Sequence, residues 1–88
     1  MHEVHRERYS LKEMAGWVLD QIRPGPRELT ELLMALDYRM DRVVAFLATL
    51  ELARLQYLEL EQRYHLGPVT LRSLTDDTPD LRALAGEG

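Results

Sequence analysis

Apolar residues recur at helical spacing from Leu11 to Ile22, and the residues on either side mark where a helix would begin and end. Ser10 and Glu13 have the S-x-x-E spacing of a capping box, in which each side chain satisfies a free backbone N–H of the first turn. The Pro-Gly-Pro sequence at 24–26 cannot continue a helix. The pattern therefore predicts a helix that begins after Ser10 and ends near Arg23.

Two further helices are predicted after this break. Leucines at helical spacing indicate a short amphipathic helix, with room for a residue or two of extended chain just before it, at Arg27 and Glu28. Asp37 is the expected N-cap of a third, longer helix running from about Tyr38 to Leu55. The leucines of the short helix are Leu29, Leu32, Leu33 and Leu36.

A change of period follows the third helix. Residues 57–62 alternate, with Leu58 and Leu60 on one face and two glutamates on the other, which is typical of a strand with one buried face. The Gly-Pro pair at 67–68 is a turn signal, and residues 69–71 alternate again. The two segments predict a β-hairpin.

The order of these elements predicts a mainly α fold with a small β-hairpin (α+β): a winged helix with three helices and a two-stranded wing. We expect residues 10–72 to form this domain, because they hold the periodic apolar residues. Residues 1–9 carry charges of both signs and two histidines, and residues 73–88 are acidic and rich in small side chains, so we expect a flexible N-terminal segment and a flexible C-terminal tail.

The third predicted helix has two apolar faces. At about 100° per residue, one arc contains Val43, Phe46, Leu50 and Ala53, the roughly opposite arc contains Val44, Ala48, Leu52 and Leu55, and Leu47 lies between them. A helix packed on one side of a small domain usually has one apolar stripe. The second face is therefore covered either by the rest of the domain or by a partner, and the spacing alone leaves both open.

Charge and composition narrow the function classes. With 11 basic and 15 acidic residues, the formal charge of −4 does not favour binding through nucleic-acid phosphates, and the charges from Asp41 to Leu55 cancel. Without cysteine, disulfides, thiolate metal sites and cysteine nucleophiles are excluded. No apolar run is long enough to span a bilayer, and the charged start lacks the apolar centre of a secretory signal, so we expect a cytoplasmic protein.

The sequence FLATLEL at 46–52, with Gln62 about ten residues later and LGPV at 66–69, resembles the C-terminal domain of the bacterial kleisin family, segregation and condensation protein A. The family pattern is VV-x-FLALLEL, then a glutamine, then F-G-[DE]-I in the wing, and LTELL at 29–33 is similar to the family's F-x-ELL. The departures keep apolar character except at Pro68, which replaces an acidic residue. The matched positions are Val43, Val44, Phe46, Leu47, Ala48, Leu50, Glu51, Leu52, Gln62 and Gly67, and the other departures are Thr49, Leu66 and Val69.

The resemblance implies a function in chromosome condensation and segregation. In kleisins the C-terminal winged helix binds the ATPase head of an SMC protein, the N-terminal domain binds the SMC neck, and a central segment binds segregation and condensation protein B. A nucleoid-associated domain that closes the SMC–kleisin ring by adhesion, with no enzymatic activity and no cofactor, is therefore expected. The expected partner-binding residues are Phe46, Thr49, Leu50 and Ala53, with Val44, Leu47 and Leu55 turned to the core.

Other functions are less well supported by the sequence. A winged-helix DNA-binding regulator is the alternative, and a winged helix that dimerises through Phe46 is another.

His2 and His5 have H-x-x-H spacing, but in a charged terminus far from His65 we do not expect a metal site. Trp17 is expected to be partial core. Gln62 either closes a hydrogen bond in the wing or meets the partner, and its position does not rank the two.

Overall fold

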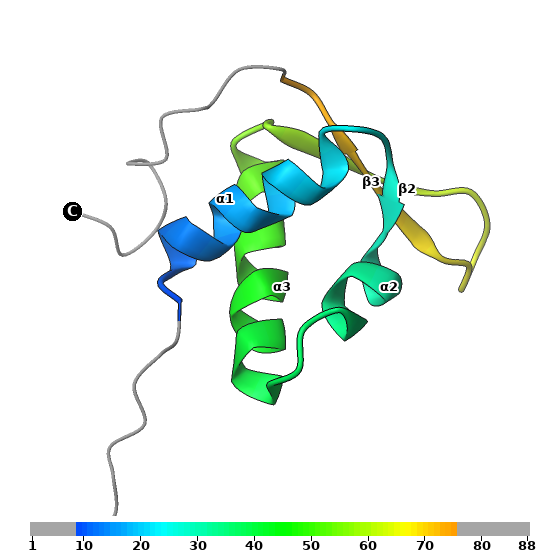
Figure 1. The fold of residues 1–88 in the computed structure, drawn as a ribbon. Helices are drawn as coiled ribbons and strands as arrows, with labels where there is room; N and C mark the ends of the chain where they lie inside the picture. The colour runs from blue at the N-terminus through cyan, green and yellow to red at the C-terminus, as the bar shows by residue number, and fades with distance from the viewer. Residues whose placement is uncertain (1–8, 76–88) are drawn as a thin grey trace, which may run out of the picture.

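The predicted order of elements is present in the computed structural model, which describes residues 9–75 (Figure 1). Three helices and a three-stranded antiparallel sheet form a small α+β winged-helix fold, which confirms the predicted fold class. The elements are α1 (Leu11–Ile22), β1 (Arg27–Glu28), α2 (Leu29–Met34), α3 (Arg39–Arg54), β2 (Leu58–Gln62) and β3 (Val69–Ser73).

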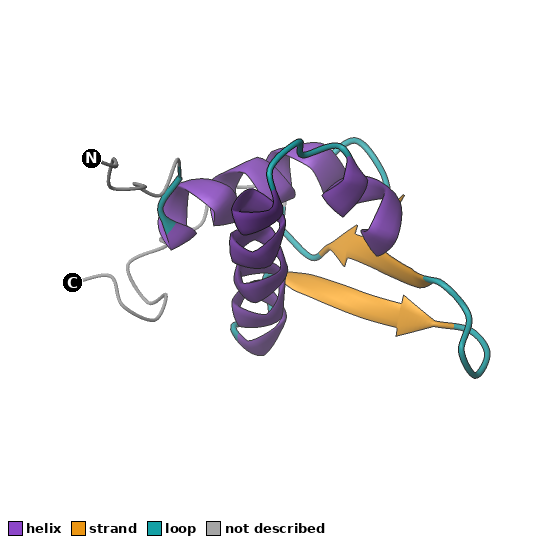
Figure 2. Ribbon diagram, turned by 90° about the horizontal axis from the view of Figure 1, so that it is seen from below, coloured by secondary structure: helices purple, strands orange, loops and turns teal. Residues whose placement is uncertain are grey.

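The sheet has the strand order β1-β3-β2, and both pairs are antiparallel. β1 occupies the two positions at which the sequence leaves room for extended chain, and it pairs with the far strand of the hairpin. Figure 2 shows the hairpin of β2 and β3 extending beyond the helices, with its connecting loop at the far end.

The hairpin continues past the predicted domain boundary at Arg72. β3 includes Ser73, and the N–H of Leu74 donates to the carbonyl of Tyr57 at 3.0 Å. The remainder of the predicted C-terminal tail, from residue 76, lies outside the described residues, as do residues 1–8 of the predicted N-terminal segment.

The capping box predicted at the start of α1 is present. The N–H of Glu13 donates to Oγ of Ser10, and the N–H of Ser10 donates to Oε1 of Glu13, both at 3.0 Å. These two bonds satisfy donors that the helix itself cannot pair. They place the beginning of α1 where the sequence predicts it.

Replacing Ser10 with alanine is expected to lower the free energy of unfolding by about 1 kcal/mol, because the Glu13 N–H loses its acceptor. Urea denaturation of the two proteins would measure the difference. Glu13→Gln is the matched control, since glutamine can still reach the Ser10 N–H and should change stability less. Equal stability of the Ser10→Ala variant and the wild type would contradict a stabilising cap.

The predicted N-cap of α3 is wrong by one residue. Tyr38 is the N-cap, with extended backbone angles and no side-chain capping hydrogen bond, so Asp37 lies just outside the helix. The α2–α3 connection is held instead by Arg42, whose Nε donates to the carbonyl of Leu36 at 2.9 Å. The helix therefore begins one residue later than capping by Asp37 implies. A hydrogen bond to the preceding connection holds this helix end in place of a capping side chain.

The core lies between α1, α3 and the inner face of the sheet. α1 contributes the largest share of buried apolar side chains, and Trp17 packs half-buried against them, as predicted. α1 and α3 form the most extensive helix–helix contact, and the small side chains Ala45 and Ala48 of α3 are buried. The buried apolar residues are Met14, Ala15, Val18, Leu19, Ile22, Leu32, Ala45, Ala48, Leu52, Leu58 and Leu71.

Gln62 closes a hydrogen bond in the wing. Its Nε2 donates to the carbonyl of Gly67 at 2.8 Å, and the N–H of Gly67 donates to the carbonyl of Tyr64 at 2.9 Å. Of the two roles that the sequence leaves open for Gln62, the structure contains this one.

Candidate protein-binding face of the third helix

α3 buries small side chains and exposes large ones. Ala45, Ala48 and Thr49 are fully buried together with Leu52. The opposite side of the helix carries four large apolar side chains at i, i+3, i+4 and i+7, which we call the outer face of α3. They are Val43, Phe46, Leu47 and Leu50, each between 40 and 49% exposed.

The outer face contains two of the four residues predicted to bind a partner. Phe46 and Leu50 lie on it, and Ala53 is half-buried beside it. Thr49 is also predicted to bind a partner, but it has no exposed surface, and its Oγ1 donates to the carbonyl of Ala45 at 2.8 Å. A partner docking on the folded domain cannot reach Thr49 without displacing the core.

The core assignments are also partly corrected. Val44 and Leu55 pack half-buried against the core, as predicted, whereas Leu47 faces outward. The outer face has the same spacing as the predicted partner-binding stripe, but it begins at Val43 and the predicted stripe begins at Phe46. This shift of three residues corresponds to a rotation of about 60° around the helix. Val43 and Leu47 are the members that the site prediction missed. The signal that could have found them is residue size, because small side chains suit a helix–helix contact, and the alanines at 45 and 48 are the buried ones in a helix on which α1 packs.

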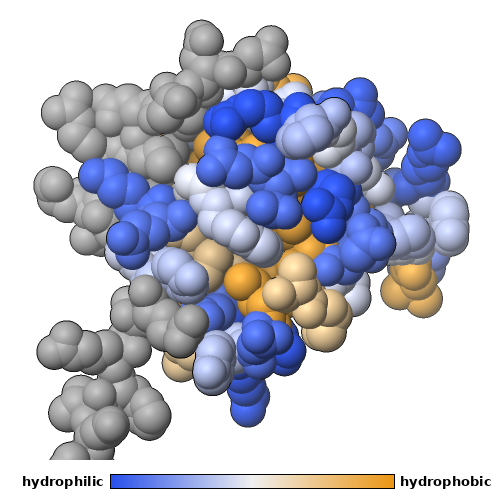
Figure 3. Space-filling model, in the orientation of Figure 1, coloured by the Kyte–Doolittle hydropathy of each residue, from blue (hydrophilic) through white to orange (hydrophobic). Residues whose placement is uncertain are grey.

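Figure 3 shows hydrophobic surface exposed near the middle of the molecule, between hydrophilic groups. Single exposed apolar residues are normal on a protein surface, but a contiguous set with a polar border marks an interaction site more often. The four exposed apolar side chains of the outer face lie at i, i+3, i+4 and i+7 on α3, so they are neighbours on the surface of one helix.

The arginines of α3 are mostly engaged within the domain. Arg42 is bonded to the Leu36 carbonyl, and Arg54 forms an ion pair with Glu51 at 2.8 Å. The hydrogen bond to Glu51 and the charge of that carboxylate raise the pKa of Arg54. A helix that reads DNA needs several unengaged donors for base edges and phosphates. Two of the three arginines of α3 are committed elsewhere, so this surface suits a phosphate backbone poorly.

No group of three or more metal-ligating side chains occurs among residues 9–75. His2 and His5 lie outside the described residues, so the structure does not test that predicted absence of a metal site. Within the same part of the chain, no helix is long and apolar enough to cross a membrane.

These features define a small winged-helix domain with an apolar outer face on its third helix. In sequence, the chain is a small domain similar to segregation and condensation protein A. It is 35% identical over 74 residues to that protein from Xylella fastidiosa, which covers 83% of this chain and 24% of the relative.

Two other relatives of the same name match comparably. The Myxococcus xanthus protein is 36% identical over 73 residues, covering 80% of this chain and 25% of the relative. The Streptococcus suis protein is 30% identical over 76 residues, covering 85% and 32%. The chain thus spans from about a quarter to about a third of the length of these relatives. No family model matches it, and no solved structure gives a significant match.

Proposed function

We propose that this domain binds the ATPase head of an SMC protein through the outer face of α3, and so acts in chromosome segregation and condensation. The observation that carries the proposal is the arrangement of α3, which exposes Phe46, Leu47 and Leu50 while it buries two alanines and a threonine. The relatives' name and the kleisin-like motif at 46–52 support the choice of partner.

The proposed activity is adhesion, without catalysis and without a cofactor of its own. A few apolar side chains in a desolvated patch supply most of the free energy of binding in many protein interfaces. ATP would bind and be hydrolysed on the partner, and this domain would hold the head to the rest of the assembly. In a full-length kleisin, other segments would bind the SMC neck and segregation and condensation protein B, at the nucleoid in the cytoplasm.

Titration calorimetry of the chain with the isolated SMC head of the same genome tests the proposal. We expect saturable binding with a negative heat-capacity change, because apolar surface is buried. A parallel titration with a short DNA duplex at several salt concentrations should show no specific binding. Salt-sensitive affinity for the duplex without affinity for the head would favour the DNA-binding alternative instead.

The dimerising alternative is tested by the mass of the free chain over a range of concentrations. We expect a monomer throughout, since the outer face is proposed to meet a different protein. A mass that doubles with concentration, and a loss of that doubling in a Phe46→Glu variant, would support self-pairing and contradict the proposed partner.

A further inference from the structure

β2 is an edge strand of the sheet. In the order β1-β3-β2 it pairs only with β3, and its other side has no strand beside it in the described part of the chain. Edge strands carry unpaired N–H and C=O groups that can accept a further strand.

The register identifies which backbone groups face the open edge. The N–H of Leu74 donates to the carbonyl of Tyr57, so these two residues form a hydrogen-bonded pair. Bonded and non-bonded pairs alternate along an antiparallel ladder. Glu59 and Glu61 therefore exchange bonds with β3, and the N–H and C=O groups of Leu58, Leu60 and Gln62 point away from it.

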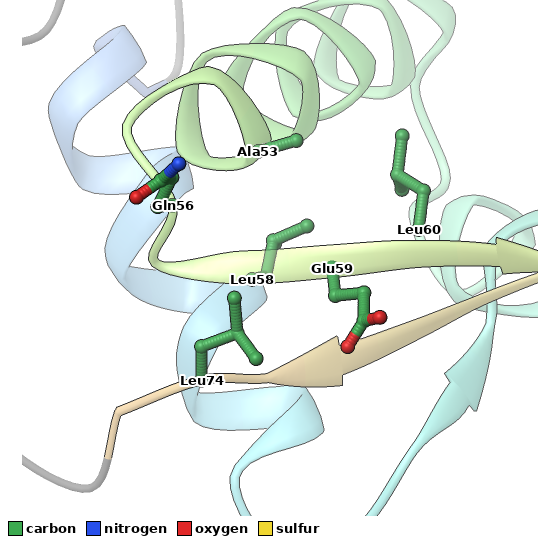
Figure 4. A pocket seen from close by; sticks show the side chains of 6 residues that line it. All are labelled: Ala53, Gln56, Leu58, Glu59, Leu60 and Leu74. Carbon is green, nitrogen blue, oxygen red and sulfur yellow. The ribbon is translucent and has the colours of Figure 1, made fainter.

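An apolar groove lies at this same edge. Ala53 of α3, Leu58 and Leu60 of β2, and Leu74 after β3 line it, together with Gln56 and Glu59. Figure 4 shows Leu58 and Leu60 on the side of β2 that faces α3, and Glu59 on the other side. The sequence predicts that both leucines are buried. Leu58 is buried in the structure, whereas Leu60 is 39% exposed.

The side of β2 away from α3 carries uncompensated negative charge. Arg72 lies directly opposite Glu59 but is bonded to Glu61, at 2.7 Å. Glu59 forms no ion pair with any described residue, so only one of the two glutamates of β2 is neutralised by Arg72.

We propose that β2 accepts an extended segment of a protein partner as a fourth strand, with apolar side chains in the groove and basic side chains opposite the glutamates. Leu58, Leu60 and Gln62 supply the main-chain hydrogen bonds, and Leu60 supplies the apolar contact. Glu59 selects the charge of the segment, because opposite charges across a strand pair stabilise it. This inference does not rest on the proposed function of the outer face of α3.

A second copy of the chain is a poor occupant of this edge. Consider antiparallel β2–β2 registers that keep the leucines on one face and overlap by three residues or more. Centring the pair on Glu59, Leu60 or Glu61 sets a glutamate against a glutamate in each case. Like charges directly opposite each other destabilise a strand pair. A basic segment of another protein avoids this repulsion.

NMR titration of the isotopically labelled chain with the peptide acetyl-KVKVKVK-amide tests the proposal. We expect the amide signals of Leu58, Leu60 and Gln62 to shift and their hydrogen exchange to slow, because these are the groups that become bonded. A peptide of the same length with glutamate in place of lysine should bind at least about tenfold more weakly. The same loss is expected for a lysine peptide with N-methylated bonds, since one or two hydrogen bonds at about 1 kcal/mol each are removed.

A variant pair tests the edge from the side of this chain. Leu60→Pro removes an N–H that points outward, so it should abolish peptide binding without breaking a bond to β3. Leu60→Ala keeps that N–H and should only weaken binding. Circular dichroism checks both folds, and the N-methylated peptide decides the question if the proline variant does not fold.

Several results would overturn the inference. One is that the lysine peptide, added until binding is saturated, leaves the amide signals of Leu58, Leu60 and Gln62 unchanged. Others are equal binding of the N-methylated peptide and equal binding of the glutamate peptide. Shifts of the same amides with chain concentration, in the absence of peptide, would show that a second copy occupies the edge.

Discussion

Replacing Leu50 with arginine is expected to weaken binding to an SMC head by at least about 30-fold while the domain stays folded. The Leu50 side chain is 42% exposed, so in the free domain an arginine can extend into solvent. In the complex the same guanidinium would be buried against apolar surface without a partner. Loss of a central anchor costs about 2 kcal/mol or more, which corresponds to the expected change in affinity.

Calorimetry with the isolated head, alongside thermal unfolding of each variant, measures the two effects separately. Met34→Arg is the matched control: it makes the same change of charge at a side chain that is 60% exposed, on α2 instead of α3. We expect the control to bind as the wild type does. Equal binding of a folded Leu50→Arg variant would mean that the head contacts another surface of the domain.

The neighbouring position gives the opposite expectation. Thr49 is fully buried, so Thr49→Arg should unfold the domain instead of producing a folded variant that fails to bind. The contrast between these two adjacent positions tests the orientation of α3 directly.

Most of the fold could be predicted because its boundaries depend on local chemistry. The capping box at Ser10 and the Pro-Gly-Pro break fix α1, and the change from helical to alternating spacing locates the hairpin. The position of β1 could also be predicted, because only two residues separate the break from the second helix. Its pairing with β3 connects residues more than forty positions apart, as in Arg27 and Leu71, and no local pattern encodes that.

The rotation of α3 could not be predicted from spacing alone. Helical periodicity showed that two faces are apolar, but both were plausible cores. The structure resolves the choice: α1 packs on α3, Ala45 and Ala48 are buried, and the larger Phe46 and Leu47 remain exposed. The family resemblance selected the face with Phe46 and Leu50, and both are exposed, whereas tertiary packing decided the burial of Thr49 and the exposure of Leu47.

A similar limit applies to β2. Alternation correctly put Leu58 and Leu60 on one face, yet burial also depends on what flanks a strand. Leu71 on the central strand is fully buried, whereas its cross-strand partner Leu60 is on the edge and remains exposed. Strand order is a property of the whole sheet, and the alternation within one strand does not contain it.

The two faces of α3 should differ most in what they contribute to stability. Truncating Leu52 to alanine is expected to lower the free energy of unfolding by about 2–5 kcal/mol, because the side chain is fully buried and leaves a cavity. A domain of this size has a total stability of only about 5–10 kcal/mol, so the variant should be close to unfolding at room temperature. Leu50→Ala removes the same atoms from the same helix at a half-exposed position, and should cost less than about 1 kcal/mol.

Urea denaturation of both variants, followed by circular dichroism, measures the difference as a shift of the midpoint at an unchanged slope. A large shift for Leu52→Ala and a small one for Leu50→Ala would show that the free domain gains little from its outer leucine. The large side chains of the outer face would then be better explained by binding than by folding. Equal shifts would instead place Leu50 in the core, and the apolar outer face would need no partner to explain it.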